Sequence, residues 1–273
     1  MRKKGLNRRF FIELSFKGNN YHGWQIQPNA LTIQQLLEES LQLLLNEKIR
    51  LTGSGRTDTG VHAGYFVAHF NSASPELEAP REIVRKLNHI LPEDIAIFSI
   101  FPVRDKDHSR FSALSRTYKY YISRQKNPFR QDTSFFIGTE LDVNAMNSAA
   151  GELFKNSDFT SFCRSNTNVK THICKIRHAS WEEREGMLVF TVQADRFLRN
   201  MVRAIVGTIL EVGYGKLSVE DFIRIIEAKD RRRAGTTAPA KGLILTGIEY
   251  PPEIFLQKPD NGYRGSRHKN YPY

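Results

Sequence analysis

Short segments with alternating apolar residues are interleaved with segments of helical apolar spacing along this 273-residue chain. Alternation at every second residue is typical of a half-buried strand, whereas recurrence every three or four residues is typical of an amphipathic helix. The first half reads β-α-β-β-α-β, with these elements predicted at residues 10–16, 32–46, 49–52, 65–70, 80–90 and 95–103. Thr32 and Gln35 have capping-box spacing at the first helix, and Pro80 suits the first turn of the second.

The second half combines strands and helices in a similar way. Strands are predicted at residues 117–123, 173–182, 187–194 and 243–250, and helices at 143–154, 197–212 and 219–229. A turn at Gly186 would join two of these strands, and Ser218 with Asp221 would cap the last helix. Two α+β halves in tandem predict a pseudo-duplicated sheet with its helices packed on one face, divided near residues 103–110.

The net charge of the chain is +11 at pH 7 and its pI is near 9.7, which indicates a polyanionic partner such as RNA or DNA. Positive charge gathers in residues 1–9, 229–233 and 258–269, and the last of these segments is accompanied by tyrosines. A basic, aromatic segment suits RNA binding, although a disordered end that does little has the same composition. A basic surface that only keeps the protein soluble is the other interpretation.

Hydrophobic residues make up 40% of the chain and charged residues 25%, which is ordinary for a globular protein. No apolar run approaches the roughly 20 residues of a membrane-spanning helix, and no apolar signal core follows the basic start. Cys163 and Cys174 form no Cys-x-x-Cys pair, and no histidine cluster stands near them at metal-ligand spacing. We therefore expect a cytoplasmic protein with two reduced thiols and no zinc site.

Residues 53–60 form a glycine-rich segment, Gly-Ser-Gly-Arg-Thr-Asp-Thr-Gly. It lacks the Gly-Lys-Ser/Thr ending of a phosphate-binding P-loop, and Asp58 stands where a dinucleotide fingerprint needs its third glycine. Glycines permit tight turns and close approach of a ligand to the backbone. An acid near Arg56 in such a loop is either part of a structural ion pair or a chemical group held ready, and the local sequence leaves both open.

Residues 53–63 closely resemble the catalytic motif of the bacterial tRNA pseudouridine synthases of the TruA family. Four further segments are similar to motifs of the same family and run in family order: residues 21–25, 116–120, 197–203 with Gly207, and 233–243. Thr59 stands where many members have alanine, and Thr236 where many have proline. Neither position carries the chemistry that the resemblance implies, so the departures leave the assignment intact.

The resemblance implies a pseudouridine synthase fold, in which two tandem ferredoxin-like α+β halves share a central, mostly antiparallel sheet with flanking helices. Residues 1–105 would form the half with the catalytic aspartate loop, and residues 106–273 the half with a tyrosine strand, an arginine helix and a basic tail. It also implies a homodimer that isomerises uridine to pseudouridine at positions 38, 39 and 40 of the tRNA anticodon stem-loop. The reaction loses no atoms and needs neither a cofactor nor a metal ion.

By the same resemblance Asp58 is the catalytic carboxylate, which either attacks ribose C1′ or takes a proton from C2′. Arg203 would pair with Asp58 and keep it ionised. Tyr118 would pack on the uracil, and Arg56 would enter the space that the flipped base leaves. The alternatives are a phosphate contact for Arg56, and simple packing for Tyr118.

Other residues of the matched segments have plainer interpretations. Arg199 stands four residues before Arg203, so helical spacing would place both on one face, where Arg199 would bind phosphate. His62, His22 and Trp24 are interpreted as support for the fold rather than as catalytic groups.

Two other functional classes compete with the isomerase. A non-catalytic RNA-binding protein or tRNA chaperone on the same scaffold would have no need for a buried acid. A base deaminase would need the His-x-Glu and Pro-Cys-x-x-Cys signature, which this sequence lacks.

Overall fold

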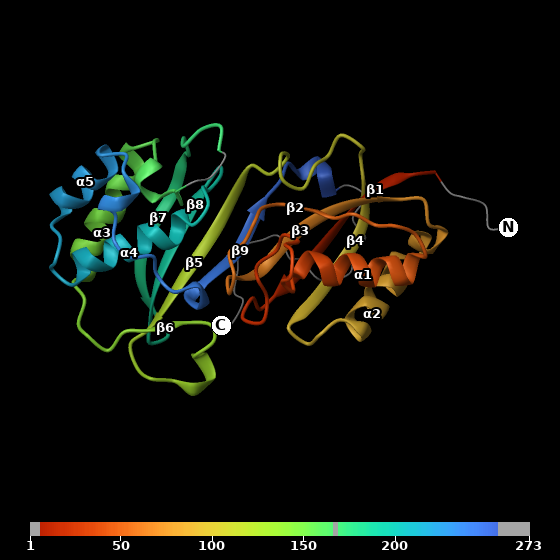
Figure 1. Ribbon diagram of the computed structural model, residues 1–273, viewed down its shortest axis with the longest axis horizontal. Helices are drawn as coiled ribbons and strands as arrows, with labels where there is room; N and C mark the ends of the chain where they lie inside the picture. Colours follow the sequence, from red (N-terminus) through yellow and green to blue (C-terminus); the bar gives the residue numbers. More distant parts are fainter. Residues whose placement is uncertain (1–5, 166–168, 256–273) are drawn as a thin grey trace. The chain divides into compact units, whose positions relative to one another are not determined.

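The computed structural model describes residues 6–165 and 169–255 (Figure 1). The chain divides into two compact units, one within Met1–Leu114 and Leu245–Tyr273 and the other within Ser115–Ile244. The strand β9 (Leu243–Glu249) therefore begins in the second unit and ends in the first. The basic segment at residues 258–269 lies outside the described residues.

The first unit follows the predicted order of elements. Its strands and helices are β1 (Arg8–Phe16), α1 (Ile33–Leu45), β2 (Thr52–Gly53), β3 (His62–Ser72), α2 (Pro80–Ile90), β4 (Ile95–Val103) and the end of β9, with short 3-10 helices at Pro75–Glu78 and Pro252–Phe255. β1 is paired antiparallel with both β3 and β4, so that Phe11 lies opposite His69 on one side and Phe101 on the other. α2 packs on β4 and contacts α1 (Figure 1).

The helix α1 forms as predicted, but the predicted strand next to it is shorter. Thr32 accepts a hydrogen bond from the amide of Gln35, while the side chain of Gln35 bonds Glu39, so only half of the capping box is made. The predicted strand at residues 49–52 is reduced to Thr52–Gly53. The amide of Leu51 donates to Glu38 Oε1 of α1 at 2.8 Å, so this amide is not available for pairing with a neighbouring strand.

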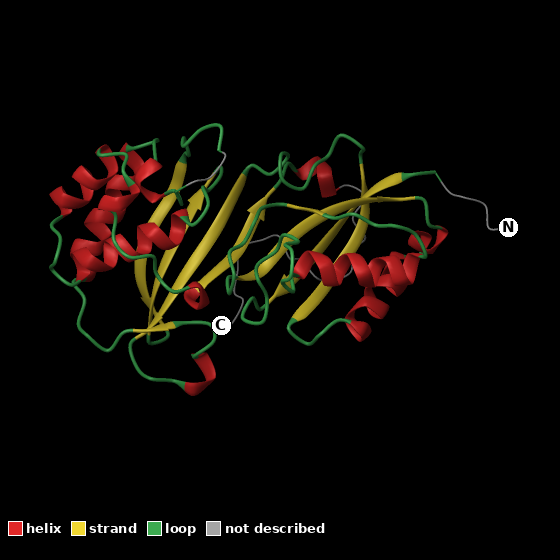
Figure 2. Cartoon of the chain, viewed as in Figure 1, coloured by secondary structure: helices red, strands yellow, loops and turns green. Residues whose placement is uncertain are grey.

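In its described residues the second unit contains one β-hairpin, three α-helices and several short 3-10 helices. Figure 2 colours these helices red and the strands yellow. Its elements are β5 (Ser115–Ser123), β6 (Phe135–Phe136), α3 (Val143–Glu152), β7 (Ile176–Arg184), β8 (Met187–Ala194), α4 (Met201–Gly213) and α5 (Val219–Glu227), with 3-10 helices at Pro128–Arg130, Leu153–Lys155, Thr160–Phe162, Arg231–Arg233 and Ala240–Gly242. β8 is antiparallel to both β5 and β7. The short β6 is paired with β5 in parallel. The predicted mixed α+β class with a mostly antiparallel sheet is confirmed.

The connections of the second unit bear out some sequence signals and correct others. The predicted turn joins β7 to β8, with positive φ at Glu185 (52°) and Gly186 (72°), as a two-residue hairpin turn requires. Ser218 and Asp221 form the complete predicted capping box of α5. β7 begins at Ile176 rather than at residue 173, because the amide of Cys174 bonds the Ser157 carbonyl instead of a strand.

The helix α4 begins four residues later than predicted. Asn200 has a left-handed conformation (φ 66°), which cannot continue a right-handed helix, and its side chain donates to the hydroxyl of Thr237 at 3.0 Å. Arg199 therefore precedes the helix, and the shared helical face expected for Arg199 and Arg203 is wrong. Eleven of the 13 residues of α4 are buried, which makes it the central helix of its unit.

Both cysteines are free thiols in the interior. Burial raises the pKa of the Cys174 thiol to about 12, so it is protonated at neutral pH. In the described part of the chain no helix has the length and apolar character needed to cross a membrane.

Candidate functional site

The glycine-rich segment forms the connection from β2 to β3 in the first unit. The amide of Ser54 donates to the Val67 carbonyl at 2.8 Å, which fixes the start of the loop on β3. At its end the amide of Val61 donates to the Asp58 carbonyl at 3.1 Å, and Gly60 takes a positive φ of 78°. Asp58 is half-buried and Arg56 is exposed. The loop thus presents an acid and a cation from a backbone anchored at both ends.

The segment at residues 18–24 braces this loop from behind. Gly23 has a φ of 84°, and a Cβ atom there would clash with the Thr57 carbonyl oxygen. The amide of Gly18 donates to Nδ1 of the buried His62 at 3.0 Å. The Trp24 ring lies against Gly53, where a Cβ atom would come within 2.5 Å of the indole nitrogen, so only glycine fits there. These contacts agree with the interpretation of His62 and Trp24 as support for the fold.

Tyr21, the first residue of the matched segment 21–25, supports the loop through contacts that the sequence did not predict. Its carbonyl accepts the amide of Gly60 at 3.4 Å, and its hydroxyl donates to the Asp94 carboxylate. Burial, helped by the Asp94 carboxylate, raises the Tyr21 pKa well above its usual value, so the hydroxyl stays protonated. The buried hydroxyl of Thr57 has no hydrogen-bond partner among the described residues. The contacts of Tyr21 cannot be predicted from local sequence, since Gly60 and Asp94 are far from it along the chain. The burial of the Thr57 hydroxyl likewise depends on how the chain packs around it.

Tyr118 lies in the middle of β5 in the second unit. It is half-buried and stands opposite Val192 of β8. Its ring meets Phe197 edge-on, with centroids 5.2 Å apart and an interplanar angle of 88°. Tyr120, two residues on, is fully buried and donates its hydroxyl to the Pro239 carbonyl at 2.9 Å. Tyr120 is therefore a packing residue, whereas Tyr118 keeps part of its surface accessible.

Arg203 occupies the first turn of α4 and is held by the segment at residues 235–239. Its Nε donates to the Ala238 carbonyl at 2.7 Å, and its own carbonyl accepts the Ala238 amide at 3.0 Å. The backbone of this segment crosses α4 so closely that a Cβ at Gly207 would clash with the Thr236 carbonyl oxygen. This contact is made by backbone, so it does not depend on whether residue 236 is threonine or proline.

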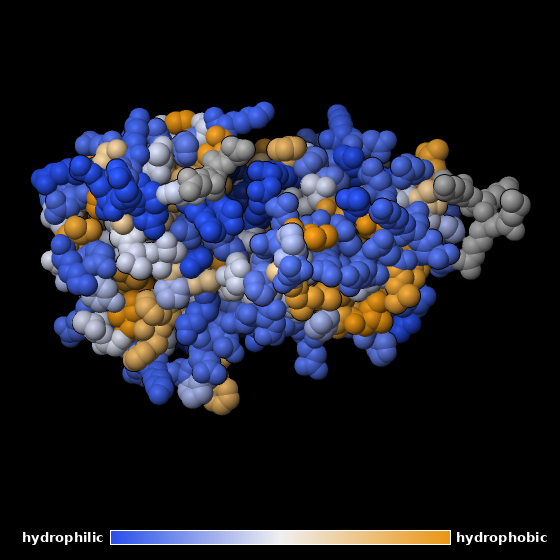
Figure 3. Space-filling model, viewed as in Figure 1, coloured by the Kyte–Doolittle hydropathy of each residue, from blue (hydrophilic) through white to orange (hydrophobic). Residues whose placement is uncertain are grey.

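The charge at Arg203 adds to that of the helix end. The amino end of a helix carries a partial positive charge, and α4 has no acidic residue in its first turn. An arginine at this end therefore creates a positive spot that favours an anionic group, either a carboxylate or a phosphate. Figure 3 shows that hydrophilic side chains cover much of the drawn face, with smaller hydrophobic areas between them.

The predicted site residues fall into two sets. Arg56 and Asp58 share one loop of the first unit, while Tyr118 and Arg203 belong to the second unit. The pairing of Asp58 with Arg203 stays a prediction. Among the described residues, no group of three or more His, Cys, Asp or Glu side chains is arranged to hold a metal ion.

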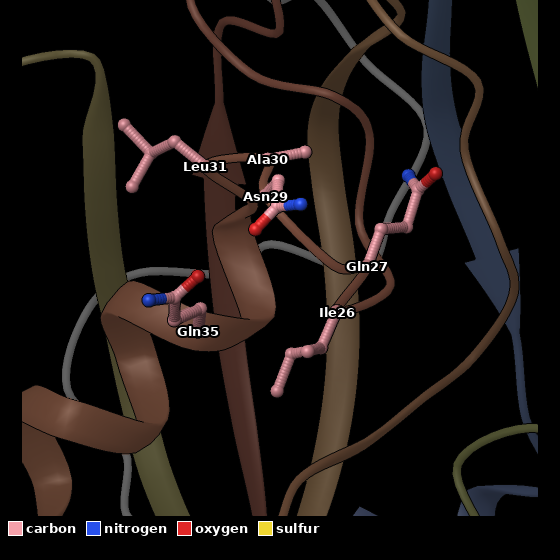
Figure 4. Close-up of a pocket in the computed structure, with 6 residues that line it drawn as sticks. All are labelled: Ile26, Gln27, Asn29, Ala30, Leu31 and Gln35. Atoms are coloured by element: carbon pink, nitrogen blue, oxygen red, sulfur yellow. The ribbon is translucent and has the colours of Figure 1, made fainter.

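A surface pocket near the start of α1 has a different character (Figure 4). Its lining is entirely neutral and consists of Ile26, Gln27, Asn29, Ala30, Leu31 and Gln35. Amide and aliphatic groups can hold a ligand by contact and hydrogen bonds, but they offer no acid or base. The lining of this pocket therefore offers no group for acid–base chemistry.

Comparisons with known proteins point to one family. A family model described as tRNA pseudouridine synthase matches residues 14–112 and 149–251, which include Asp58 and Arg203 but not Tyr118. A protein of Bacteroides fragilis named tRNA pseudouridine synthase A is 52% identical over 249 residues, covering 91% of this chain and 98% of that protein. Proteins of the same name from Parabacteroides distasonis (49% identical, 91% and 98% covered) and Exiguobacterium sibiricum (38% identical, 89% and 97% covered) are also similar.

Proposed function

The chain belongs to the tRNA pseudouridine synthase family, and we propose that it converts uridine to pseudouridine at positions 38, 39 and 40 of the tRNA anticodon stem-loop. The coarser activity, isomerisation of uridine in tRNA, follows from membership of the family. The positions 38, 39 and 40 rest on the resemblance to the family. The observation that supports the proposed chemistry is the loop between β2 and β3, which holds half-buried Asp58 between backbone anchors. A loop that is anchored near both ends and carries one acid suits a reaction at a single sugar carbon.

In the proposed reaction the bond from ribose C1′ to uracil N1 breaks, the base turns, and C1′ bonds to C5. The proton lost from C5 is balanced by a proton gained at N1, so substrate and product are isomers. Asp58 acts in one of two ways: its carboxylate attacks C1′ and forms an ester that the turned base displaces, or it removes the C2′ proton and later returns it. Both routes need an ionised carboxylate next to the ribose.

The other three residues have proposed roles around the flipped uridine. Arg56 is exposed on the same loop as Asp58, so its guanidinium can fill the space that the base leaves in the RNA stack. Tyr118 has an accessible part beyond its edge contact with Phe197, and we propose that it packs on the uracil. Arg203, at the positive end of α4, would pair with Asp58 and keep it charged.

The wider setting is also a proposal. We propose that the protein works as a homodimer in the cytoplasm, with one tRNA contacting both subunits. Residues 1–105 would supply the aspartate loop, and residues 106–273 the tyrosine strand, the arginine helix and a basic tail. The net charge of +11 supports recognition of the tRNA backbone and its shape rather than of one base sequence.

The direct test is a pseudouridine map of tRNA from cells with and without this protein. We expect pseudouridine at positions 38, 39 and 40 to disappear in cells that lack it and to return when the gene is restored. Modified positions elsewhere in the same tRNAs serve as the internal control. Unchanged modification at all three positions, with no other enzyme acting there, would contradict the proposal.

A Gly23→Ala substitution should lower the rate of pseudouridine formation about 10²-fold, because a shift of about 1 Å in catalytic geometry has that effect. The added methyl group would clash with the Thr57 carbonyl, which directly precedes Asp58, and would push the loop away from residue 23. The rate at saturating tRNA is the quantity to measure, with circular dichroism as a check on folding.

The matched control for this variant is Gly215→Ala. Gly215 also has a positive φ (68°), but a Cβ atom there meets nothing within 4 Å. Both variants carry the strain of a left-handed alanine, about 1–2 kcal/mol. An equal loss of rate in the two variants would show that strain, rather than contact with the Asp58 loop, is responsible.

A further inference from the structure

In the first unit four aromatic rings are in successive contact from the core to the surface, and we call this row of rings the aromatic ladder. It consists of Phe11, His69, His108 and Phe111. Phe11 is fully buried, and its ring centroid lies 6.2 Å from that of His69. His69 is 4.4 Å from His108, and His108 is 4.4 Å from Phe111, again between ring centroids. Phe111 ends the ladder with 77% of its surface exposed. A large apolar ring with this much exposed surface is available for contact with a binding partner.

The turn that carries Phe111 is braced by hydrogen bonds. Nδ1 of His108 accepts the amides of Arg110 at 3.1 Å and of Phe111 at 3.3 Å. The amide of His108 in turn donates to the hydroxyl of Ser112 at 2.9 Å. Phe111 is therefore held out into solvent by an ordered turn rather than by a loose one. A preorganised ring loses little conformational freedom when something stacks on it.

Hydrogen bonds connect the aromatic ladder to β2, the strand that leads into the Asp58 loop. The hydroxyl of Ser109 lies 2.8 Å from Nδ1 of His69 and donates to the Thr52 carbonyl at 2.7 Å. Thr52 begins β2 and is paired with His69 of β3. The base of the Phe111 turn is thus bonded to the backbone just before the catalytic loop.

The chemistry around Phe111 fits a nucleobase. The guanidinium of Arg110 lies 5.6 Å from the centre of the Phe111 ring, so a cation and an aromatic face are offered together. Burial lowers the pKa of His69 to about 4 and also lowers that of His108, so both rings are neutral at neutral pH. Neutral rings stack well, while the positive charge at Arg110 and across the chain attracts phosphates.

We propose that Phe111 is a stacking platform for an unpaired base of the tRNA substrate, close to the reacting uridine, with Arg110 beside it for the neighbouring phosphate. The base would stack on the exposed ring of Phe111 at the end of the aromatic ladder. Every base has a face that can stack, so this contact adds affinity without adding sequence specificity. The proposal rests on the proposed function, since it assumes that tRNA is the RNA bound.

The test compares tRNA binding and turnover of Phe111→Ala, Phe111→Trp and the unaltered protein. Loss of one stacked base should raise both the Kd and the KM for tRNA about tenfold, with kcat changed less than about twofold. Phe111→Trp should restore binding, and its indole fluorescence should change when tRNA is added. The natural tryptophans, Trp24 and Trp181, are buried, with 2% and 4% of their surface exposed, and the unaltered protein with and without tRNA measures their contribution to the signal.

Leu43→Ala is the control, because Leu43 is 74% exposed on α1 of the same unit and its loss should leave binding unchanged. Equal tRNA affinity of Phe111→Ala and the unaltered protein would overturn the proposal. So would a change in oligomeric mass of Phe111→Ala in sedimentation, which would place Phe111 between copies of the chain. If the unaltered protein binds tRNA but forms no pseudouridine, the proposed function fails, and the binding comparison still decides the role of Phe111.

Discussion

An Asp58→Ala variant should form no detectable pseudouridine while binding tRNA as tightly as the unaltered protein. Asp58 is the single acid in the segment at residues 53–60, so no neighbour in the loop can replace its carboxylate. A group that acts as a nucleophile or base at the reacting sugar contributes a rate factor of about 10³ or more. The loop is anchored through backbone groups of Ser54 and Val61, and these two backbone bonds remain when the side chain of residue 58 is shortened.

The measurement is single-turnover formation of pseudouridine on an anticodon stem-loop, alongside the Kd of the same RNA. Asp58→Asn, which keeps the size of the side chain but not its charge, should be equally inactive. Asp105→Ala removes an exposed acid from the same unit and should retain full activity. Activity of either Asp58 variant within about tenfold of the unaltered protein would remove Asp58 from the centre of the mechanism. A loss of RNA binding in step with activity would assign Asp58 a structural role.

The elements that the sequence predicted best are those whose boundaries depend on local signals. α2 and β4 have the predicted bounds, because Pro80 opens one and the alternation of the other is uninterrupted. The start of α4 was missed, because residues 197–200 are apolar enough to continue the helical pattern. Asn200 leaves that pattern through its bond to Thr237, a residue 37 positions away that no local window includes.

The same distinction applies to the candidate site: features within one sequence segment could be predicted, whereas contacts between distant segments could not. The loop with Arg56 and Asp58 could be found because its glycines and charges are contiguous. The contact of Gly23 with Thr57 could not be predicted, since it joins residues that are distant in sequence. The ladder that ends at Phe111 is likewise invisible in the sequence, because Phe11, His69 and His108 come from separate segments. Packing geometry, rather than residue type, decides these features.

A Gly207→Ala substitution should lower the free energy of unfolding by about 3 kcal/mol, near the upper end of what overpacking a core usually costs. The new Cβ would collide with the carbonyl oxygen of Thr236 and lie 3.2 Å from the amide nitrogen of Ala238. Both neighbours are backbone, so no side chain can rotate out of the way. The displaced segment also holds Arg203 through the Ala238 carbonyl, so activity should fall with stability.

Gly151→Ala makes the same chemical change in another helix and should have the opposite sign. A Cβ at Gly151 in α3 meets nothing within 4 Å, and alanine is favoured over glycine in a helix by up to about 1 kcal/mol. Denaturant unfolding of the two variants, with equal slopes, measures the difference directly. If Gly207→Ala were as stable as Gly151→Ala, the crossing of α4 by residues 235–238 would be loose, and the position of Arg203 would need another support. A stable but inactive Gly207→Ala would instead separate the placement of Arg203 from the stability of the fold.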